Sequence, residues 1–234
     1  MKITFIGTGY VGLVSGVLFA DLGNDVICVD TNKDKIVNLK KGVIPIFEPG
    51  LEEILKKNLK SKRITFTTDL SKAVMASKII FIAVGTPTAK DGVSADLKNV
   101  FKVTKQIATN VNNYKIIINK STVPVGTGDE VEKIISKRVK KNNFDIVSNP
   151  EFLREGEAIR DFKYPDRIII GSNNLKKTKS ILERLYLPII NKGAKFLSVS
   201  RRSAELIKYA SNAFLATKIT FINEIANLCE VTNT

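Results

Sequence analysis

Histidine and tryptophan are both absent from this chain of 234 residues. Without histidine, the protein cannot use a histidine general base, a serine–histidine or cysteine–histidine pair, or an imidazole-bound metal. Any proton transfer must therefore fall to carboxylates, lysine, tyrosine or water. We also expect no metal ion in the site.

Cysteine is nearly as scarce, because only Cys28 and Cys229 are present and they cannot form a CxxC site. This excludes a disulfide framework and indicates reduced thiols in a cytoplasmic protein. The N-terminal run "ITFIGTGYVGLVSGVLFA" is apolar, as in a signal peptide or a membrane span. Its glycines, however, are spaced for a strand, a loop and a helix, and no second apolar stretch of spanning length follows. We therefore expect no membrane partner.

Positive charge is in excess, with a formal net charge of +14. Such charge can attract nucleic acids or membrane surfaces. The lysines are nevertheless scattered through stretches such as "KKNLKSKR", "KRVKKNN" and "NLKKTKS", without interleaved aromatic residues. We interpret them as a solvated surface whose field can favour anionic small molecules, and we expect no nucleic-acid partner.

Short apolar runs alternate with segments long enough for helices, which predicts an α/β fold. The predicted strands are "KITFIG", "DVICVD", "RITFTT", "KIIFIAVG", "YKIIINK", "FDIVSN" and "DRIIIG". Isoleucine and valine on both faces of these strands are typical of a parallel sheet that helices cover on both sides. The sequence therefore predicts a Rossmann-like, doubly wound parallel sheet.

The C-terminal part of the chain differs from the rest. From about Ser203 to Thr232 the sequence contains neither glycine nor proline, which predicts one helix longer than the usual roughly 8–20 residues. We therefore divide the chain into residues 1–200, a nucleotide-binding domain, and residues 201–234, the start of a long helix that leaves it.

A glycine motif follows the first predicted strand. Gly7, Gly9 and Gly12 form GxGxxG at the opening of a helix. In this motif the first glycine permits a tight turn, the second lets the backbone approach a pyrophosphate, and the third lets helix and strand pack closely. The free amides of the helix N-terminus can then bind the anion. We include Tyr10 and Val11 of this loop in the candidate cofactor site.

An acidic residue, Asp30, ends the second predicted strand at the distance expected for a ribose ligand. Its charge favours NAD over NADP, because a 2′-phosphate would be repelled. Lys33 and Lys35 lie close by and leave NADP open, and Lys35 is also a candidate cofactor residue. The alternative is a structural glycine turn with a solvent-facing aspartate.

Two later motifs, "AVGTPT" at 83–88 and "NKSTVPVGTG" at 119–128, also follow apolar strands. The carboxyl ends of parallel strands form the crevice in which such sheets bind ligands. We therefore expect the hydroxyl groups of Thr86, Ser121 and Thr122 to face cofactor or substrate. The alternative is that these residues cap the helices that follow.

Two further pairs are spaced at i and i+4. Glu151 and Glu155, in "SNPEFLREG", could share one helical face, and so could Lys208 and Asn212, in "ELIKYASNAFLA". Each pair could line a cleft and take part in catalysis. The alternatives are surface acids and an ordinary solvated helix stripe.

Together, the motifs resemble the UDP-glucose/GDP-mannose dehydrogenase family, and most closely its members that oxidise UDP-glucose. The similar stretches occur in order along nearly the whole chain: "GTGYVGLVSG", "PIFEPGLEE", "FIAVGTPT", "KSTVPVGTGD", "SNPEFLREG", "PDRIIIG" and "RRSAELIKYASNAFLATKITFINEIANLCE". The resemblance implies oxidation of the sugar's primary alcohol to a carboxylate, in two hydride transfers with two NAD and a cysteine thioester.

The resemblance also implies roles for individual residues. Glu151 would aid hydrolysis of the thioester, Thr122 would help to position water, and Glu155 would support the site and the cofactor. Lys208 and Asn212 would stabilise developing oxyanion charge, the kind of interaction that is often the largest catalytic contribution. Together with Glu151, Lys208 and Asn212, the substrate site would include Phe152, Leu153 and Arg154.

The nucleophilic cysteine of this family lies in a glycine-rich segment beyond the long helix, and no such segment is present here. Cys229 instead lies within that helix, in a stripe with Ile222 and Ile225, and we interpret it as a core or subunit-contact residue. The resemblance then implies a truncated enzyme that dimerises through the long helix. The alternatives are a non-catalytic NAD-binding or oligomerisation module, and the same chemistry on GDP-mannose or an N-acetylated UDP-sugar.

Overall fold

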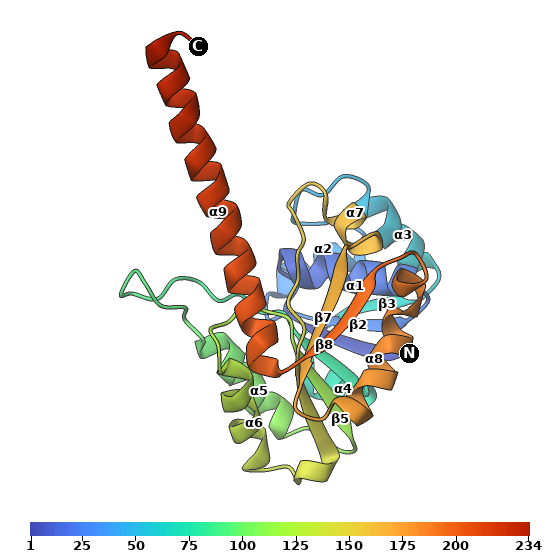
Figure 1. The fold of residues 1–234 in the computed structure, drawn as a ribbon. Helices are drawn as coiled ribbons and strands as arrows, with labels where there is room; N and C mark the ends of the chain where they lie inside the picture. The colour runs from blue at the N-terminus through green and yellow to red at the C-terminus, as the bar shows by residue number, and fades with distance from the viewer.

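The computed structural model describes residues 1–234, except for the side chains of residues 175 and 176. One eight-stranded sheet forms its centre, in the order β3-β2-β1-β4-β5-β6-β7-β8 (Figure 1). In that order the strands are β3 (Ile64–Thr67), β2 (Asp25–Val29), β1 (Lys2–Ile6), β4 (Ile79–Ile82), β5 (Lys115–Asn119), β6 (Phe144–Ser148), β7 (Arg167–Ser172) and β8 (Lys195–Val199). The first six strands in this order run parallel. From β1 the sheet extends through β2 to β3 on one side and through β4 to β6 on the other, so the predicted doubly wound, Rossmann-like fold is confirmed.

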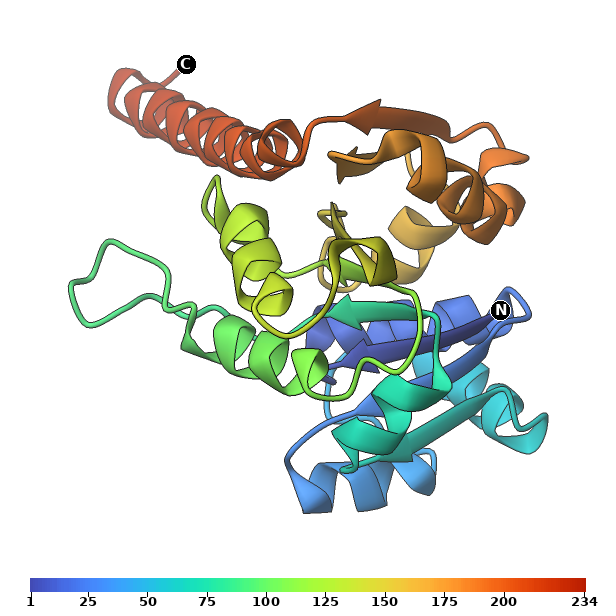
Figure 2. The same cartoon turned by 90° about the horizontal axis from the view of Figure 1, so that it is seen from below.

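Helices cover both faces of the sheet, as the two-sided apolar strands require (Figure 2). One apolar core lies under α1 (Tyr10–Asp21), α2 (Lys33–Lys40), α3 (Leu51–Lys60), α7 (Ala158–Lys163) and α8 (Leu175–Ile190). The other lies under α4 (Leu70–Ala76), α5 (Lys98–Ala108) and α6 (Thr127–Ser136). A short 3₁₀ helix, Lys141–Asn143, precedes β6.

The far edge of the sheet departs from the prediction of a purely parallel sheet. Strand β7 pairs with β6 in the antiparallel direction, through the two pairs Val147–Ser172 and Ser148–Gly171. The connection between them, residues 149–166, contains only the short helix α7, and β7 starts from the edge of the sheet at which β6 ends. Strand β8 was not predicted, because it is a partly exposed edge strand without a continuous apolar run.

The predicted long helix is present as α9 (Arg201–Thr232), which begins two residues before Ser203. The side chain of Ser200 caps it by accepting a hydrogen bond from the amide of Ser203 at 3.0 Å. Its first turns pack on β6 and β7, and the remainder extends away from the domain as an arm (Figures 1 and 2). Among the residues described, no helix combines the length and apolar character that crossing a membrane requires.

Candidate functional site

The glycine loop between β1 and α1 has the strand–turn–helix context that the motif requires. Gly7 adopts φ +101°, and a Cβ atom there would lie 2.5 Å from the carbonyl oxygen of Ala83. A Cβ atom on Gly12 would lie 2.0 Å from the carbonyl oxygen of Gly7. These two glycines are therefore demanded by the backbone packing itself.

Gly9 differs from both of these glycines. Its backbone has φ −68° and ψ −173°, which any residue can adopt, and a Cβ atom there would meet nothing within 4 Å. Gly9 is also the N-cap of α1 and supplies no capping side chain, so the first amides of the helix stay available. The space beside it is thus open to an anion that binds the helix N-terminus.

A cavity of about 360 Å³ lies over this loop. Four of the predicted cofactor residues line it, namely Gly7, Gly9, Asp30 and Lys35. The sequence reasoning missed Gly85 and four α5 residues, Asn99, Lys102, Val103 and Gln106, because a side chain facing a crevice from a helix carries no motif. Val11 is predicted as well but lies outside this lining, half-buried in the first turn of α1.

The carboxylate of Asp30 is held in one orientation. It accepts hydrogen bonds from the amide of Thr8 at 3.0 Å, from the Thr8 hydroxyl at 2.6 Å and from the amide of Asn32 at 3.0 Å. Burial acts to raise the pKa of Asp30, but these hydrogen bonds together hold it below its ordinary value. The Lys35 ammonium lies 3.4 Å from Oδ2, so a fixed anion with a cation beside it closes this end of the crevice.

Tyr10 connects the glycine loop to the loop after β6. Its hydroxyl donates a hydrogen bond to Glu48, and that carboxylate also accepts from the amides of Gly156 at 3.0 Å and Ile159 at 3.2 Å. Glu48 belongs to the "PIFEPGLEE" stretch and is buried. The Tyr10 hydroxyl therefore points to the loop that carries Glu151 and, through Glu48, helps to hold that loop in place.

The hydroxyl groups expected to face a ligand are partly occupied by the protein. Thr86 donates to the carbonyl oxygen of Thr122 at 2.8 Å, and Ser121 donates to that of Val84 at 2.7 Å. These bonds tie the two loops together at the carboxyl ends of β4 and β5. The alternative that these residues cap the following helices is wrong, since the N-caps of α5 and α6 are Leu97 and Gly126.

Glu151 and Lys208 form an ion pair, with 2.9 Å between Oε1 and Nζ and side chains only 11% and 9% exposed. The other carboxylate oxygen of Glu151 accepts from the amide of Leu153 at 2.6 Å. Of the two predicted i, i+4 pairs, only Lys208 and Asn212 share a helical face, one turn apart on α9. Residues 151–154 are not helical, so Glu151 shares no helical face with Glu155, which is exposed, and Asn212 is exposed one turn beyond Lys208.

The aromatic ring of Phe152 lies beside this ion pair. The guanidinium carbon of Arg167 is 4.8 Å from the ring centroid and the Lys208 ammonium nitrogen is 5.4 Å from it. Arg154, by contrast, is engaged with Asp161, whose Oδ1 and Oδ2 accept from Nη2 at 2.7 Å and from Nε at 3.0 Å. This contact lowers the pKa of Asp161.

The start of α9 places Lys208 in the site. Glu205, buried on the preceding turn, accepts hydrogen bonds from the amides of Gly126 at 2.7 Å and Gly128 at 2.8 Å, and from the Ser148 hydroxyl at 3.0 Å. Its carboxylate therefore caps the N-terminus of α6, where negative charge is favoured. Sequence reasoning missed Glu205, because a cap supplied from a distant helix leaves no local pattern.

Neither thiol lies at the ion pair. Cys28 is buried in β2, and burial raises the pKa of its thiol. Cys229 is partly buried near the far end of α9, where 21 residues at 1.5 Å each place it about 30 Å from Lys208. The interpretation of Cys229 as a helix residue away from this site agrees with that distance.

A doubly wound sheet with an open glycine turn, a fixed acid after β2 and a crevice between them defines a dinucleotide-binding protein. Comparison with known protein families identifies which dinucleotide-binding family this is. Residues 1–190 match the NAD binding domain of the UDP-glucose/GDP-mannose dehydrogenase family, and residues 202–234 match its central domain. The chain belongs to this family, and the prediction of NAD as the cofactor is confirmed.

Named relatives and solved structures agree with this assignment. The chain is 54% identical to the UDP-glucose 6-dehydrogenase of Rhizobium meliloti, over 98% of this chain and 53% of the relative, and 54% identical to UDP-glucose 6-dehydrogenase TuaD of Bacillus subtilis, over 98% and 49%. A ternary complex of GDP-mannose dehydrogenase from Pseudomonas aeruginosa superposes with TM-score 0.93 at 36% identity, over 98% of this chain and 53% of that structure. A UDP-glucose dehydrogenase from Pyrobaculum islandicum superposes with TM-score 0.90 at 42% identity, over 96% and 52%. The chain therefore spans about half the length of these relatives.

Proposed function

We propose that this chain is the NAD-binding part of a cytoplasmic enzyme that oxidises UDP-glucose to UDP-glucuronate. The observation that carries the proposal is the buried Glu151–Lys208 ion pair, which lies at the same edge of the sheet as the dinucleotide crevice. The names of the two relatives reported above support UDP-glucose as the sugar nucleotide.

The ion pair suits the second half of such an oxidation. Lys208 is an ammonium donor with little exposure to water, so it can stabilise oxyanion charge more strongly than a surface lysine could. Glu151 holds that ammonium in place and is a carboxylate able to take a proton from water. Thr122 and Asn212 complete the proposed catalytic set, and Glu155 supports it.

The proposed substrate residues surround the same pair. Phe152 and Leu153 supply apolar surface. Arg154, held by Asp161, lines a neighbouring cavity that Phe152 also lines. The thioester step needs a thiol that neither cysteine supplies at this site within one copy of the chain. For this reason a non-catalytic NAD-binding or oligomerisation module is the second candidate function.

The cofactor in this proposal is NAD and not NADP. A 2′-phosphate would be placed against the fixed Asp30 carboxylate, and the nearest cation, Lys35, already lies 3.4 Å from that carboxylate. A hydroxyl group, which can donate to Asp30, fits this position better.

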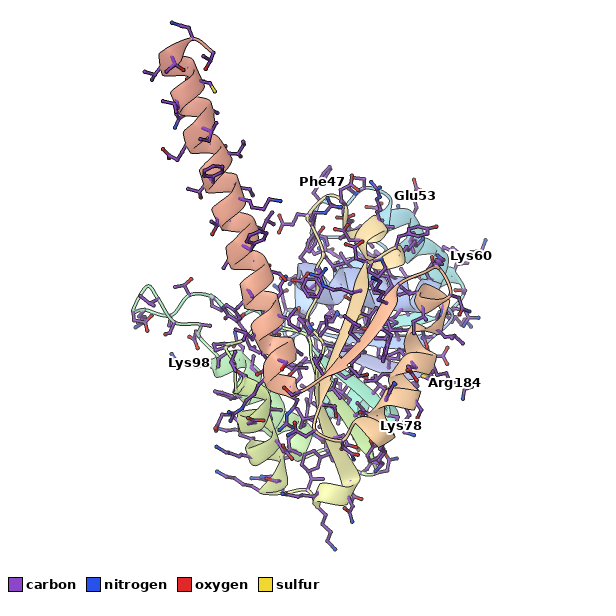
Figure 3. All side chains as sticks on the ribbon, in the orientation of Figure 1. Phe47, Glu53, Lys60, Lys78, Lys98 and Arg184 are labelled. Atoms are coloured by element: carbon purple, nitrogen blue, oxygen red, sulfur yellow. The ribbon has the colours of Figure 1, made fainter. Side chains whose placement is uncertain are left out.

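We also propose that two copies associate through α9, with residues 1–200 and 201–234 as separate domains. The part of α9 beyond Asn212 exposes apolar side chains that no other element covers (Figure 3). They are Phe214, Leu215, Ile219, Phe221, Ile222, Ile225, Leu228 and Val231. Apolar area on this scale is typical of an association surface, and a second copy offers the same stripe.

The cofactor site is tested by Gly9→Val. The variant should fold normally, because the position has ordinary backbone angles and open space, yet it should lose NAD binding because the new side chain fills the pyrophosphate position. Calorimetric titration with NAD and circular dichroism check both points. Gly12→Ala is the contrasting variant, expected to lose stability instead. Unchanged NAD affinity in folded Gly9→Val would overturn the assignment.

The reaction is tested by NADH formation with NAD and UDP-glucose, beside parallel assays with GDP-mannose and an N-acetylated UDP-sugar. Turnover with UDP-glucose that disappears in Lys208→Met supports the proposed function. NAD binding without turnover of any of the three favours the second candidate. A preference for GDP-mannose would overturn the substrate assignment.

A further inference from the structure

Lys120 is a buried cation that the proposed mechanism does not use. It follows β5 directly and is 5% exposed. Within the part of the chain that the structure describes, its ammonium nitrogen donates only to Asn149, to the carbonyl oxygen at 3.5 Å and to Oδ1 at 3.3 Å. Both distances are long for hydrogen bonds. The same Oδ1 already accepts from the Tyr186 hydroxyl at 2.5 Å. Among the side chains described, no carboxylate lies within 4.0 Å of it.

The surroundings of Lys120 connect it to the ion pair. Together with Glu151 it lines a cavity of about 50 Å³, which is large enough for water. The remaining titratable groups on this cavity come from three elements: Asp161 on α7, Arg167 on β7 and Tyr186 on α8. Asp161 is paired with Arg154, so Glu151 is the carboxylate left to balance the buried ammonium.

We propose that Lys120 is a positioning residue of the Glu151–Lys208 site, in which it acts as a second cation on the single carboxylate. This inference rests on the proposed function and adds a residue to it. With Lys120 protonated, two ammonium groups face one carboxylate and the site carries net positive charge. That charge favours an anionic ligand or developing oxyanion, and it falls by one unit when Lys120 gives up its proton.

The charge of this site should change within an accessible pH range. Burial lowers the pKa of Lys120 to about 8, while Glu151 acts to raise it and Lys208 acts to lower it. The two influences have opposite signs, so each neighbour can be tested separately. A role confined to packing would not produce such a pattern.

The direct test is an NMR titration of the lysine side chains in the 234-residue chain, with Lys120 assigned by its absence in Lys120→Met. We expect Glu151→Gln to lower its pKa and Lys208→Met to raise it, each by about half a pH unit or more. Glu224→Gln and Lys218→Met make the same changes on the exposed part of α9 and should leave it unchanged. Shifts of one sign in both site variants, or titration of Lys120 at an ordinary lysine pKa, would overturn the proposal.

The functional test is the dissociation constant of UDP-glucose with NAD present, measured at intervals from about pH 6.5 to 9.5. In the unaltered chain we expect the constant to rise about three- to tenfold as Lys120 loses its proton. Lys120→Met should bind weakly at every pH, whereas Lys120→Arg, which stays charged, should keep tight binding above pH 8. A pH step that persists in Lys120→Met contradicts the proposal. Absence of UDP-glucose binding at any pH would instead contradict the proposed function, and the NMR titration would still decide the role of Lys120.

Discussion

The two parts of helix α9 distribute polar and apolar side chains in opposite ways. In its first turns the buried residues are Arg201, Ala204, Glu205 and Lys208, three of them charged. Beyond Asn212 the helix exposes phenylalanine, leucine, isoleucine and valine instead. Within one continuous helix, burial therefore follows the position of the neighbouring elements and not the hydropathy of the residue.

The anchored part, residues 201–208, can bury charge because each charge has a partner. Arg201 donates to Asp129 at 2.6 Å and Glu132 at 2.5 Å, while Glu205 caps α6 and Lys208 pairs with Glu151. The hydrogen bonds offset the cost of removing these groups from water. The projecting part, residues 213–231, has no neighbouring element to bury its apolar stripe, so we expect it to behave as a separate, associating surface.

The largest effect on folding should come from Glu205→Ala. It removes three hydrogen bonds to a buried carboxylate and leaves the amides of Gly126 and Gly128 without partners, which should cost about 3 kcal/mol. Urea denaturation gives the free energy of unfolding. Glu224→Ala, in the projecting part, is the matched control and should stay within about 0.5 kcal/mol. Equal losses in both variants would contradict the distinction between the two parts.

A smaller effect is expected where α9 crosses β7. A Cβ atom on Gly171 would lie 2.6 Å from that of Ala204 and 2.8 Å from the carbonyl oxygen of Ser200, so Gly171→Ala should push the helix away and cost about 2 kcal/mol. Gly85→Ala adds the same methyl group where nothing lies within 4 Å and should be nearly neutral. If Gly171→Ala proved as stable as Gly85→Ala, α9 would not be packed tightly against the sheet.

Because the Lys120 ammonium is buried beside the anchored part, the free energy of unfolding should depend on pH. The pKa of Lys120 is about 8 in the folded chain, against an ordinary lysine value of 10.5, so between these values the unfolded chain binds more protons. Stability must then rise with pH in this window, by roughly 1 kcal/mol from pH 7 to pH 9. Unfolding free energies measured across that range, minus those of Lys120→Met, isolate the contribution. A flat or falling difference would contradict the burial of a charged Lys120.

The smallest effect on folding is expected in the projecting part, from Ile222→Asp. Because Ile222 is exposed, the free energy of unfolding should change by no more than about 0.5 kcal/mol. Self-association, measured by sedimentation equilibrium, should nevertheless weaken about tenfold or more, since a charge would enter the apolar stripe. Asn223→Asp, which adds the same charge at the neighbouring position outside the apolar stripe, is the matched control. Unaltered association in Ile222→Asp would place the contact between copies elsewhere.

Several features could be predicted because their cause is local. The alternation of two-sided apolar strands with helices predicts the doubly wound sheet, and the spacing of three glycines predicts the turn before α1. The motif also predicts a different role for each glycine, and the contacts in the structure agree with those roles. Gly7 and Gly12 are required by contacts with the backbone of Ala83 and of Gly7, and only Gly9 is open toward a ligand.

Other features could not be predicted, because their cause lies far away in the chain. The i, i+4 spacing of Glu151 and Glu155 indicated a shared helical face, yet residues 151–154 are irregular and Glu151 pairs with Lys208. Strand β8 was not predicted, because a strand at the edge of the sheet needs only one apolar face. Lys120 and Glu205 were not predicted either, because their partners come from other elements of the fold.

By itself, the sequence determined the class of fold, the pyrophosphate turn, the acid that follows β2, the length of α9 and the family. These depend on periodicity and short spacings, which act over a few residues. Only the tertiary structure decided which polar residues meet: Glu151 with Lys208, Glu205 with the start of α6, and Lys120 with Asn149. Burial makes such pairings energetically decisive, because a charge removed from water must find its partner wherever the packed chain provides one.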